Sequence, residues 1–288
     1  MTTHTNVAAH ERRLTERLGE LWAYRHLVGN LVIRDLKVRY KNSTLGFLWS
    51  LASPLLMMLV FYLIFGVMQR ASVNRAFHLF VLTGLLPWNW FNMAVAGGIN
   101  CIVGNASLIN KVYFPREILP ISVVLGELVN FLFAVPVLIV MLYLWHIPLT
   151  IHALWLPVII AIQAVFTLGV VFLLACANVY YRDTAKIMEV VLLAWFFATP
   201  IFYDYDSAFT QVLHVGPWSI EAGRLAYILN PMGTLVANYR TVLYGSPLGP
   251  PSAPDALFLL RTAATAFVIL VIGYWAFTRR AGRFGEEV

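Results

Sequence analysis

Six apolar stretches separated by short polar segments dominate the sequence. A helix rises about 1.5 Å per residue, so about 20 apolar residues cross a hydrocarbon core of about 30 Å. We therefore predict an integral membrane protein of the all-α class with six transmembrane helices. The predicted spans are Leu45–Met68, Phe77–Val103, Ile118–Trp145, Ala153–Tyr180, Ile187–Tyr203 and Leu257–Phe277, of which the fifth is the shortest.

The segment between the last two spans, residues 204–256, has a different pattern. It is too long for a turn and too apolar for a solvated linker, and six prolines divide it into short pieces. Part of it, Tyr227–Gly245, keeps a helical spacing of apolar residues. Irregular backbone at membrane depth persists only where it packs on protein or lines a cavity. We predict a re-entrant or interfacial helical hairpin here.

Composition supports a membrane protein and gives its orientation. Apolar residues make up 60% of the chain and charged residues only 12%, against roughly 25% charged in soluble domains. With the N-terminus in the cytoplasm, fifteen Lys and Arg residues lie inside and four outside, as the positive-inside rule requires. The net charge of +6 therefore reflects topology, and no nucleic-acid partner is needed to explain it. We expect both termini to be cytoplasmic and the first span to be retained, because no secretory signal pattern precedes it.

These patterns divide the chain into residues 1–44 as a cytoplasmic N-terminal segment, 45–278 as the transmembrane domain and 279–288 as a cytoplasmic tail. Within the first segment, apolar residues recur at helical spacing from Leu21, and Arg34, Lys37 and Lys41 lie along another face. This pattern predicts an amphipathic helix in the headgroup plane. Its cations face either anionic membrane lipids or a soluble partner, and the pattern does not separate the two.

A second candidate interface is Asn105–Ser122, "NASLINKVYFPREILPIS", on the predicted cytoplasmic side. A loop that only connects two spans is usually more polar than this one. We predict a short helix that presents Leu108, Ile109, Val112, Tyr113 and Phe114 outside the bilayer. The alternative is an interfacial helix that rests on lipid.

Several stretches resemble one family. "RDLKVRYKNSTLGFLWSLASPLLMMLVFYLIFG", "NKVYFPREILP", "YRD" at Tyr181–Asp183, "ATPIFY" and "LNPM…YR" are similar to the membrane subunits of bacterial ABC exporters for cell-surface polysaccharides, such as O-antigen, teichoic acid, capsule and galactan chains. The resemblance covers about Leu31 to the C-terminus. It implies a homodimer in the cytoplasmic membrane with two ATPase subunits and a lipid-linked polysaccharide as substrate. It also implies an interface helix, a coupling helix at about 105–117 and external gate helices within 204–256.

The resemblance identifies candidate residues for contact with the ATPase. The chain has no GxxxxGK[ST] motif, so it lacks the phosphate cradle of a P-loop. We therefore expect it to bind no cofactor itself, with ATP and Mg²⁺ on the partner subunit. The candidate coupling residues are Leu108, Ile109, Lys111, Val112, Tyr113, Phe114, Arg116 and Glu117, together with Arg34 and Lys37.

Aromatic residues crowd the first and fifth spans. Aromatic faces stack on the C–H faces of sugar rings and could hold a sliding polymer by many weak contacts. Interfacial belts and lipid-facing packing also use these residues, so both interpretations stay open. The channel-lining candidates are Phe47, Trp49, Phe61, Tyr62, Trp195, Phe196 and Tyr203, with Glu127 of the third span.

Glu127 is an acid near the centre of the third span. Charges there are costly, so an intramembrane acid is by default a functional hypothesis. The alternative is a packing anchor that is protonated or hydrogen-bonded to Asn130 or to a neighbouring helix. Cys101 and Cys176 have no CxxC partner and are expected to be structural thiols.

Motifs for catalysis are absent: we find no HExxH, no GxSxG and no metal-ligand spacing, and therefore predict no catalytic and no metal residues. Two other functions remain as alternatives. One is an intramembrane enzyme acting on polyprenyl-linked sugars, for which Glu127 and Asp183 are the available acids. The other is an ATP-independent carrier.

Overall fold

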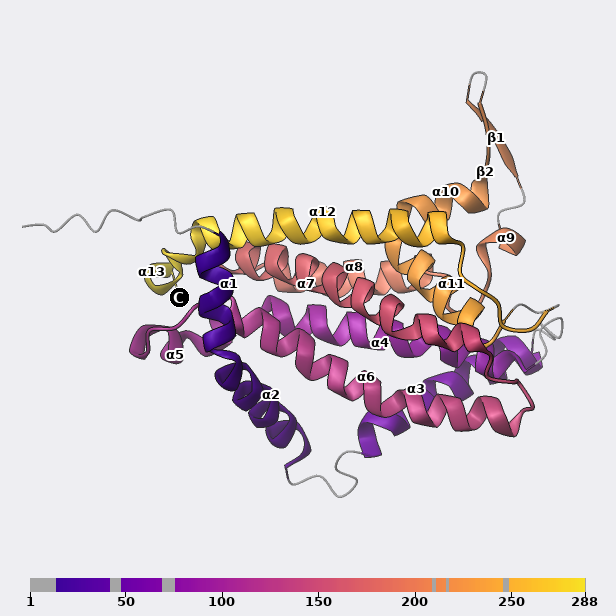
Figure 1. Ribbon diagram of the computed structural model, residues 1–288, viewed down its shortest axis with the longest axis horizontal. Coiled ribbons are helices and arrows are strands. Elements are labelled where there is room, and N and C mark those ends of the chain that lie inside the picture. The colour runs from indigo at the N-terminus through magenta and orange to yellow at the C-terminus, as the bar shows by residue number, and fades with distance from the viewer. Residues whose placement is uncertain are drawn as a thin grey trace, which may run out of the picture.

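The computed structural model describes residues 14–41, 48–68, 76–208, 211–215, 218–245 and 249–287 as one elongated helical bundle (Figure 1). Within the described part, four helical segments are long and apolar enough to cross a membrane. The chain is therefore a multi-pass membrane protein. These segments are α4 (Phe77–Ile99), α6 (Ile118–Leu144), η3 (Ile151–Trp155) with α7 (Leu156–Tyr180), and α12 (Ala256–Ala281).

The first and fifth predicted spans form shorter helices. The first consists of α3 (Leu48–Phe61) and continues in the π-helical turns of η1 (Tyr62–Met68). The fifth, α8 (Thr184–Ala198), has 15 residues and ends earlier than the predicted boundary at Tyr203. Its end follows from Pro200, because a residue before proline is disfavoured in the helical region, and Thr199 is extended.

Helix α4 lies at the centre of the bundle, where α3, α6, α7, α8 and α11 (Pro231–Leu243) pack around it. Its apolar side chains are buried on almost every side. Gln163 of α7 is fully buried and donates from Nε2 to the Pro87 carbonyl of α4 at 2.7 Å. This bond pairs the Nε2 end of a polar side chain at membrane depth, where an unpaired amide is costly, whereas Oε1 has no partner among the described residues.

Two glycines allow α7 and α12 to pack closely. A Cβ on Gly169 would lie 2.6 Å from the backbone nitrogen of Leu270, and Gly273 lies against the Gly169 carbonyl. Small residues permit this kind of close backbone approach between membrane helices. Cys101 and Cys176 are free and buried in the same half of the bundle, as expected for structural thiols.

The 204–256 segment contains two helices, in the stretch where a re-entrant or interfacial helical hairpin was predicted, together with an unpredicted β-hairpin. Helices α10 (Ala222–Leu229) and α11 meet at Asn230, whose Oδ1 accepts from the Gly233 nitrogen at 3.1 Å and caps α11. Before them, α9 (Tyr205–Ala208) leads to β1 (Val212–Val215), which pairs antiparallel with β2 (Trp218–Glu221). The prediction of the all-α class stands, with the addition of a short β-hairpin that projects sideways from the bundle near one end (Figure 1).

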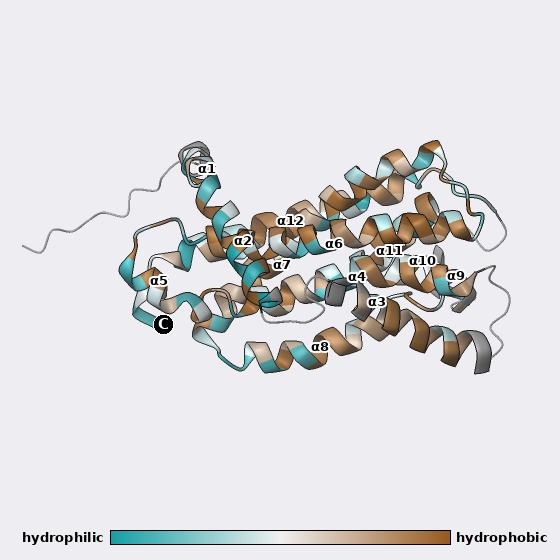
Figure 2. Cartoon of the chain, turned by 90° about the horizontal axis from the view of Figure 1, so that it is seen from below, coloured by the Kyte–Doolittle hydropathy of each residue, from teal (hydrophilic) through white to brown (hydrophobic). Residues whose placement is uncertain are grey.

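The opposite end of the bundle carries the remaining short helices and the C-terminus (Figure 1). Hydrophilic residues gather on α1, α2 and α5, whereas hydrophobic residues follow the long helices (Figure 2). We refer to this side of the molecule as the α5 end. Its elements are α1 (Leu14–Ala23), α2 (Arg25–Tyr40), η2 (Val103–Asn105), α5 (Ala106–Lys111) and α13 (Phe284–Glu287).

Candidate functional site

Residues 105–117, predicted as the coupling helix, are called the coupling segment below. Some of its side chains point inward and others outward. Val112 and Tyr113 project from the α5 end, with 51% and 78% of their surface exposed. Ile109 and Phe114 do not project as predicted, because they are buried in an apolar cluster that also contains Phe284. The segment therefore has an exposed tip, Val112 and Tyr113, and a buried base, Ile109 and Phe114.

The polar residues of this segment also divide. Lys111 is exposed, whereas Glu117 is buried at the start of α6. Burial lowers the pKa of the Arg116 guanidinium, and the neighbouring Glu117 carboxylate opposes that shift. Among the described residues, the Arg116 Nη1 atom has no hydrogen-bond partner. Arg116 therefore carries a buried N–H donor without a described partner at the α5 end.

A hollow of about 510 Å³ opens beside this tip, between the coupling segment and the last turn of α12. Ala281 and Gly282 form its far wall. A Cβ on Gly285 of α13 would lie 3.4 Å from both Arg116 Nη2 and Asn110 Oδ1. The C-terminal turn thus packs against the coupling segment and supports it, a relationship that the sequence did not indicate.

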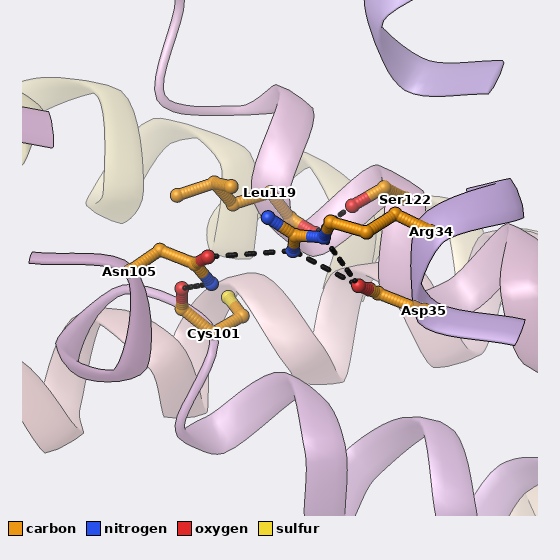
Figure 3. A network of polar contacts seen from close by, with 6 residues as sticks. All are labelled: Arg34, Asp35, Cys101, Asn105, Leu119 and Ser122. Atoms are coloured by element: carbon orange, nitrogen blue, oxygen red, sulfur yellow. Dashed lines mark hydrogen bonds and ion pairs between the residues drawn. The ribbon is translucent and has the colours of Figure 1, made fainter. Parts of the chain in front are cut away.

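Arg34 of α2 lies against the start of this segment (Figure 3). Its guanidinium pairs with Asp35 at 2.9 Å and donates from Nη2 to Asn105 Oδ1 at 3.4 Å. Asn105 in turn donates to the Cys101 carbonyl at 2.8 Å. Arg34 therefore connects the N-terminal helix to the coupling segment, whereas Lys37 is exposed. Leu31 and Val32 of α2 are buried and pack inward, whereas Ile33 and Val38 of the same helix are exposed.

Glu127 is paired with a cation that sequence reasoning did not assign to it. Arg39, near the end of α2, donates to Glu127 Oε1, and Asn130 donates to Oε2 at 3.0 Å. The Glu127 side chain is 6% exposed and that of Arg39 is 42% exposed. The predicted contact with Asn130 is confirmed. The missing clue was that a buried carboxylate needs a positive partner, and the basic stretch before the first span could supply one.

The Arg39–Glu127 pair lies on the wall of a cavity of about 300 Å³. Helices α2, α3, α4 and α6 all contribute to it, so it lies between the N-terminal helix and the first three spans. Its walls combine charged and amide side chains with aromatic ones, including Trp90 and Phe131, whose rings stack at 5.2 Å.

The aromatic candidates of α3 and α8 are only partly brought together. Phe61 packs on Phe196 with ring centroids 5.7 Å apart and on Phe202 at 5.5 Å. Tyr62 is exposed, with its ring edge-on to His78. Trp195 faces the other way, into the core against the aromatic residues of α4 and α7.

Three further channel candidates add less. The Tyr203 hydroxyl donates to the Phe197 carbonyl at 2.9 Å, so its polar end is directed back to α8. Phe47 lies outside the described residues, and Trp49 lies in α3 without a described side chain. One face of α8 is nevertheless apolar and exposed over its whole length, through Ile187, Val190, Leu193 and Phe197.

Arg240 of α11 is a site residue that sequence reasoning counted only as an external cation. It is 6% exposed, and its guanidinium donates to the carbonyls of Pro200 and Ile201 and, at 3.2 Å, to that of Phe80. Asn230 makes a second connection to the end of α8, by accepting from Trp195 Nε1 at 2.9 Å. These bonds fix the 204–256 segment to the membrane bundle.

The described helices define a polytopic membrane protein with an exposed tip at one end. The chain belongs to the ABC-2 type transporter family, whose model matches residues 26–216. The match runs from α2 to the β-hairpin and includes the coupling segment, the Arg39–Glu127 pair and α8.

Curated relatives resemble the chain over most of its length. An O-antigen export system permease protein RfbA of Myxococcus xanthus is 38% identical over 93% of this chain and 98% of the relative. A protein of the same name from Klebsiella pneumoniae is 30% identical over 88% and 91%. The polysialic acid transport protein KpsM of Escherichia coli is 23% identical over 69% and 81%.

Proposed function

We propose that this chain is the membrane subunit of an ATP-driven exporter that moves lipid-linked polysaccharide, an O-antigen-like glycan, across the bacterial cytoplasmic membrane. The observation that carries the proposal is the end-to-end similarity to a permease of O-antigen export, at 38% identity. Two copies of the chain work with two ATPase subunits, which bind ATP and Mg²⁺. The chain itself carries out no catalysis.

The exposed tip, Val112 and Tyr113, is the contact with the ATPase. Its buried base shares one apolar cluster with Leu31 of α2 and Phe277 of α12. A movement of the tip therefore reaches the N-terminal helix and the last span together, because close-packed side chains transmit displacement. Lys111, Arg116 and the exposed Lys37 provide a positive rim around it.

The subunit has six spans if α3 with η1 and α8 also cross the membrane, in addition to the four long helical segments. The distribution of Lys and Arg places the α5 end in the cytoplasm and the β-hairpin outside. The exposed apolar face of α8 then meets the second copy of the chain, and the aromatic side chains of α3 and α8 line the shared path. The 204–256 segment controls the outer exit.

The geometry of Glu127 argues against the intramembrane enzyme. Each carboxylate oxygen of Glu127 already accepts a hydrogen bond, one from Arg39 and one from Asn130, which favours a structural role over that of a catalytic acid. The pair is better suited to holding α2 against α6, which its position between these helices supports.

Co-purification with an ABC ATPase subunit from the same organism tests the proposal. Replacing a central aromatic contact weakens an interface by about 2 kcal/mol or more, so Tyr113→Ala should lower the association constant at least about tenfold. Tyr143→Ala is the matched control, because Tyr143 is equally exposed at the other end of α6. Stable association with equal affinity for both variants would rule out the tip as the contact. No association of the unaltered chain would rule out the exporter.

A further inference from the structure

The cavity beside the Arg39–Glu127 pair has the composition of a binding site for a polar, uncharged group. Guanidinium, carboxylate and two carboxamides, those of Asn89 and Asn130, lie on its wall. Apolar walls come from α4 and α6, including Trp90 and Phe131. A volume of about 300 Å³ is at the lower end of the range for small-ligand pockets, which suits one head group and not a polymer.

The charges on the wall cancel. Arg39 and Glu127 neutralise each other, so a phosphate would meet a buried carboxylate and a cation would meet the guanidinium. Like charges in such low-dielectric surroundings repel strongly. A hydroxyl group fits both partners, because it donates to carboxylate oxygens and accepts from guanidinium and amide N–H groups.

Asn89 provides an additional polar contact. Its side chain is partly buried on the cavity wall and makes no hydrogen bond to another residue in the described ranges. An amide in an apolar membrane setting gains considerably from a partner. Its carboxamide can accept from one hydroxyl and donate to a neighbouring one, as vicinal hydroxyls of a sugar require.

Access to the cavity is from the side of the bundle. Arg39, Ser53 and Met93 are exposed wall residues, and they belong to α2, α3 and α4 along the length of the bundle. Asn89 and Glu127 both lie well inside their membrane helices. The opening lies on the side of the bundle, between α2, α3 and α4, and a ligand that enters through it from the bilayer carries a lipid chain.

We propose that this cavity binds an uncharged sugar of a glycolipid that enters sideways from the membrane. The proposal rests on the proposed function and adds a separate sugar site to it, away from the aromatic side chains shared by α3 and α8. Arg39, Glu127, Asn130 and Asn89 bond the hydroxyls, and Trp90 with Phe131 forms the apolar wall beside the ring.

Photolabelling of the full-length chain in lipid nanodiscs tests the site. The probe is an alkyl glucoside with a diazirine in its alkyl chain, and the comparison probes carry a phosphate or a trimethylammonium head on the same chain. We expect the glucoside to label the α4 and α6 peptides, competed by excess unlabelled glucoside, and the charged probes to label them at least fivefold less. Equal labelling by the phosphate probe would overturn the proposal.

Asn89→Leu provides the decisive variant, since it removes no hydrogen bond within the described protein. It should reduce glucoside labelling about fivefold, as expected for one lost hydrogen bond. Asn92→Leu is the matched control, because Asn92 is on the same helix but does not line the cavity. Unchanged labelling of Asn89→Leu overturns the site.

The outcome separates this site from the proposed function. If the chain associates with its ATPase but Asn89→Leu leaves glucoside labelling unchanged, the sugar site is refuted and the proposed exporter function stands. If labelling depends on Asn89 in a chain that binds no ATPase, the sugar site stands and the ATP-driven mechanism fails.

Discussion

The Arg240 guanidinium lies 3.6 Å from the centroid of the Phe80 ring, so the 204–256 segment is attached to the central helix α4 by a buried cation. The same guanidinium donates to the carbonyls of Pro200 and Ile201, just after α8 ends. One side chain therefore joins α11, α4 and the end of α8. Movement of the outer segment requires either breaking these bonds or moving the three elements together.

Arg240→Met should destabilise the protein. It keeps most of the side-chain volume and removes every donor, which leaves buried carbonyls unpaired at about 1–3 kcal/mol each. We expect a lower melting temperature in nanodiscs and faster proteolysis within 204–256. Arg224→Met, in the same segment but at an exposed position, is the control. Equal melting temperatures for the two variants would contradict this role of Arg240.

Gly84→Ala, a change on α4 next to Arg240, should also destabilise the protein. A Cβ there would lie 2.8 Å from Arg240 Nη2 and 3.1 Å from Val236 Cγ1, so the guanidinium has to leave its carbonyl partners. Overpacking of this kind costs about 1–3 kcal/mol. The control is Gly126→Ala on α6, where a Cβ meets nothing within 4 Å. The melting temperatures of both variants test this prediction. A Gly84→Ala protein that is more stable than the unaltered chain would be inconsistent with the described packing.

The Arg39–Glu127 pair predicts a non-additive double variant. Arg39→Gln leaves a buried carboxylate without its cation and should cost about 1–3 kcal/mol, less than for a fully buried pair because Arg39 is partly exposed. Adding Glu127→Gln should recover most of that loss. Melting temperatures of the two single variants and the double variant measure the coupling. Purely additive losses would mean that the two side chains do not interact.

Phe284 supports the coupling segment and gives a further prediction. Its ring packs edge-on to Phe277 at 5.1 Å, in the cluster that holds Ile109 and Phe114. Phe284→Ala removes a buried ring, a change that costs about 3–5 kcal/mol in a well-packed core. We expect faster hydrogen exchange in α5 and weaker stimulation of the ATPase. Phe267→Ala, at an exposed position of α12, should change neither, and unchanged exchange in Phe284→Ala would argue against this support.

Local patterns in the sequence predicted much of the fold. Long apolar runs identified the four helices of membrane-crossing length, and the Glu127–Asn130 bond was predictable because the two residues are one helical turn apart. The Arg39–Glu127 pair was not, since 88 positions separate its members. Nor could the pattern show that Ile109 and Phe114 turn inward, because the chain becomes extended at Val112, just after α5.

The 204–256 segment shows the same limit. Its amphipathic run indicated helix where α10 and α11 lie, whereas a search for apolar periodicity did not find the short hairpin of β1 and β2. Arg240 was read as a surface cation because nothing local reveals that carbonyls 40 positions earlier surround it. Contacts of this kind depend on tertiary packing, which a single sequence does not display.

Depletion of the chain in cells, followed by localisation of lipid-linked glycan, tests the central claim most directly. The account predicts that depleted cells lose the polysaccharide from their surface. Lipid-linked glycan should instead accumulate on the cytoplasmic face of the membrane, where externally added glycosidase does not reach it. Restoring the unaltered chain should return the polymer to the surface, and Tyr113→Ala should restore it poorly. Normal surface polymer after depletion, with no glycan retained inside, would contradict the account.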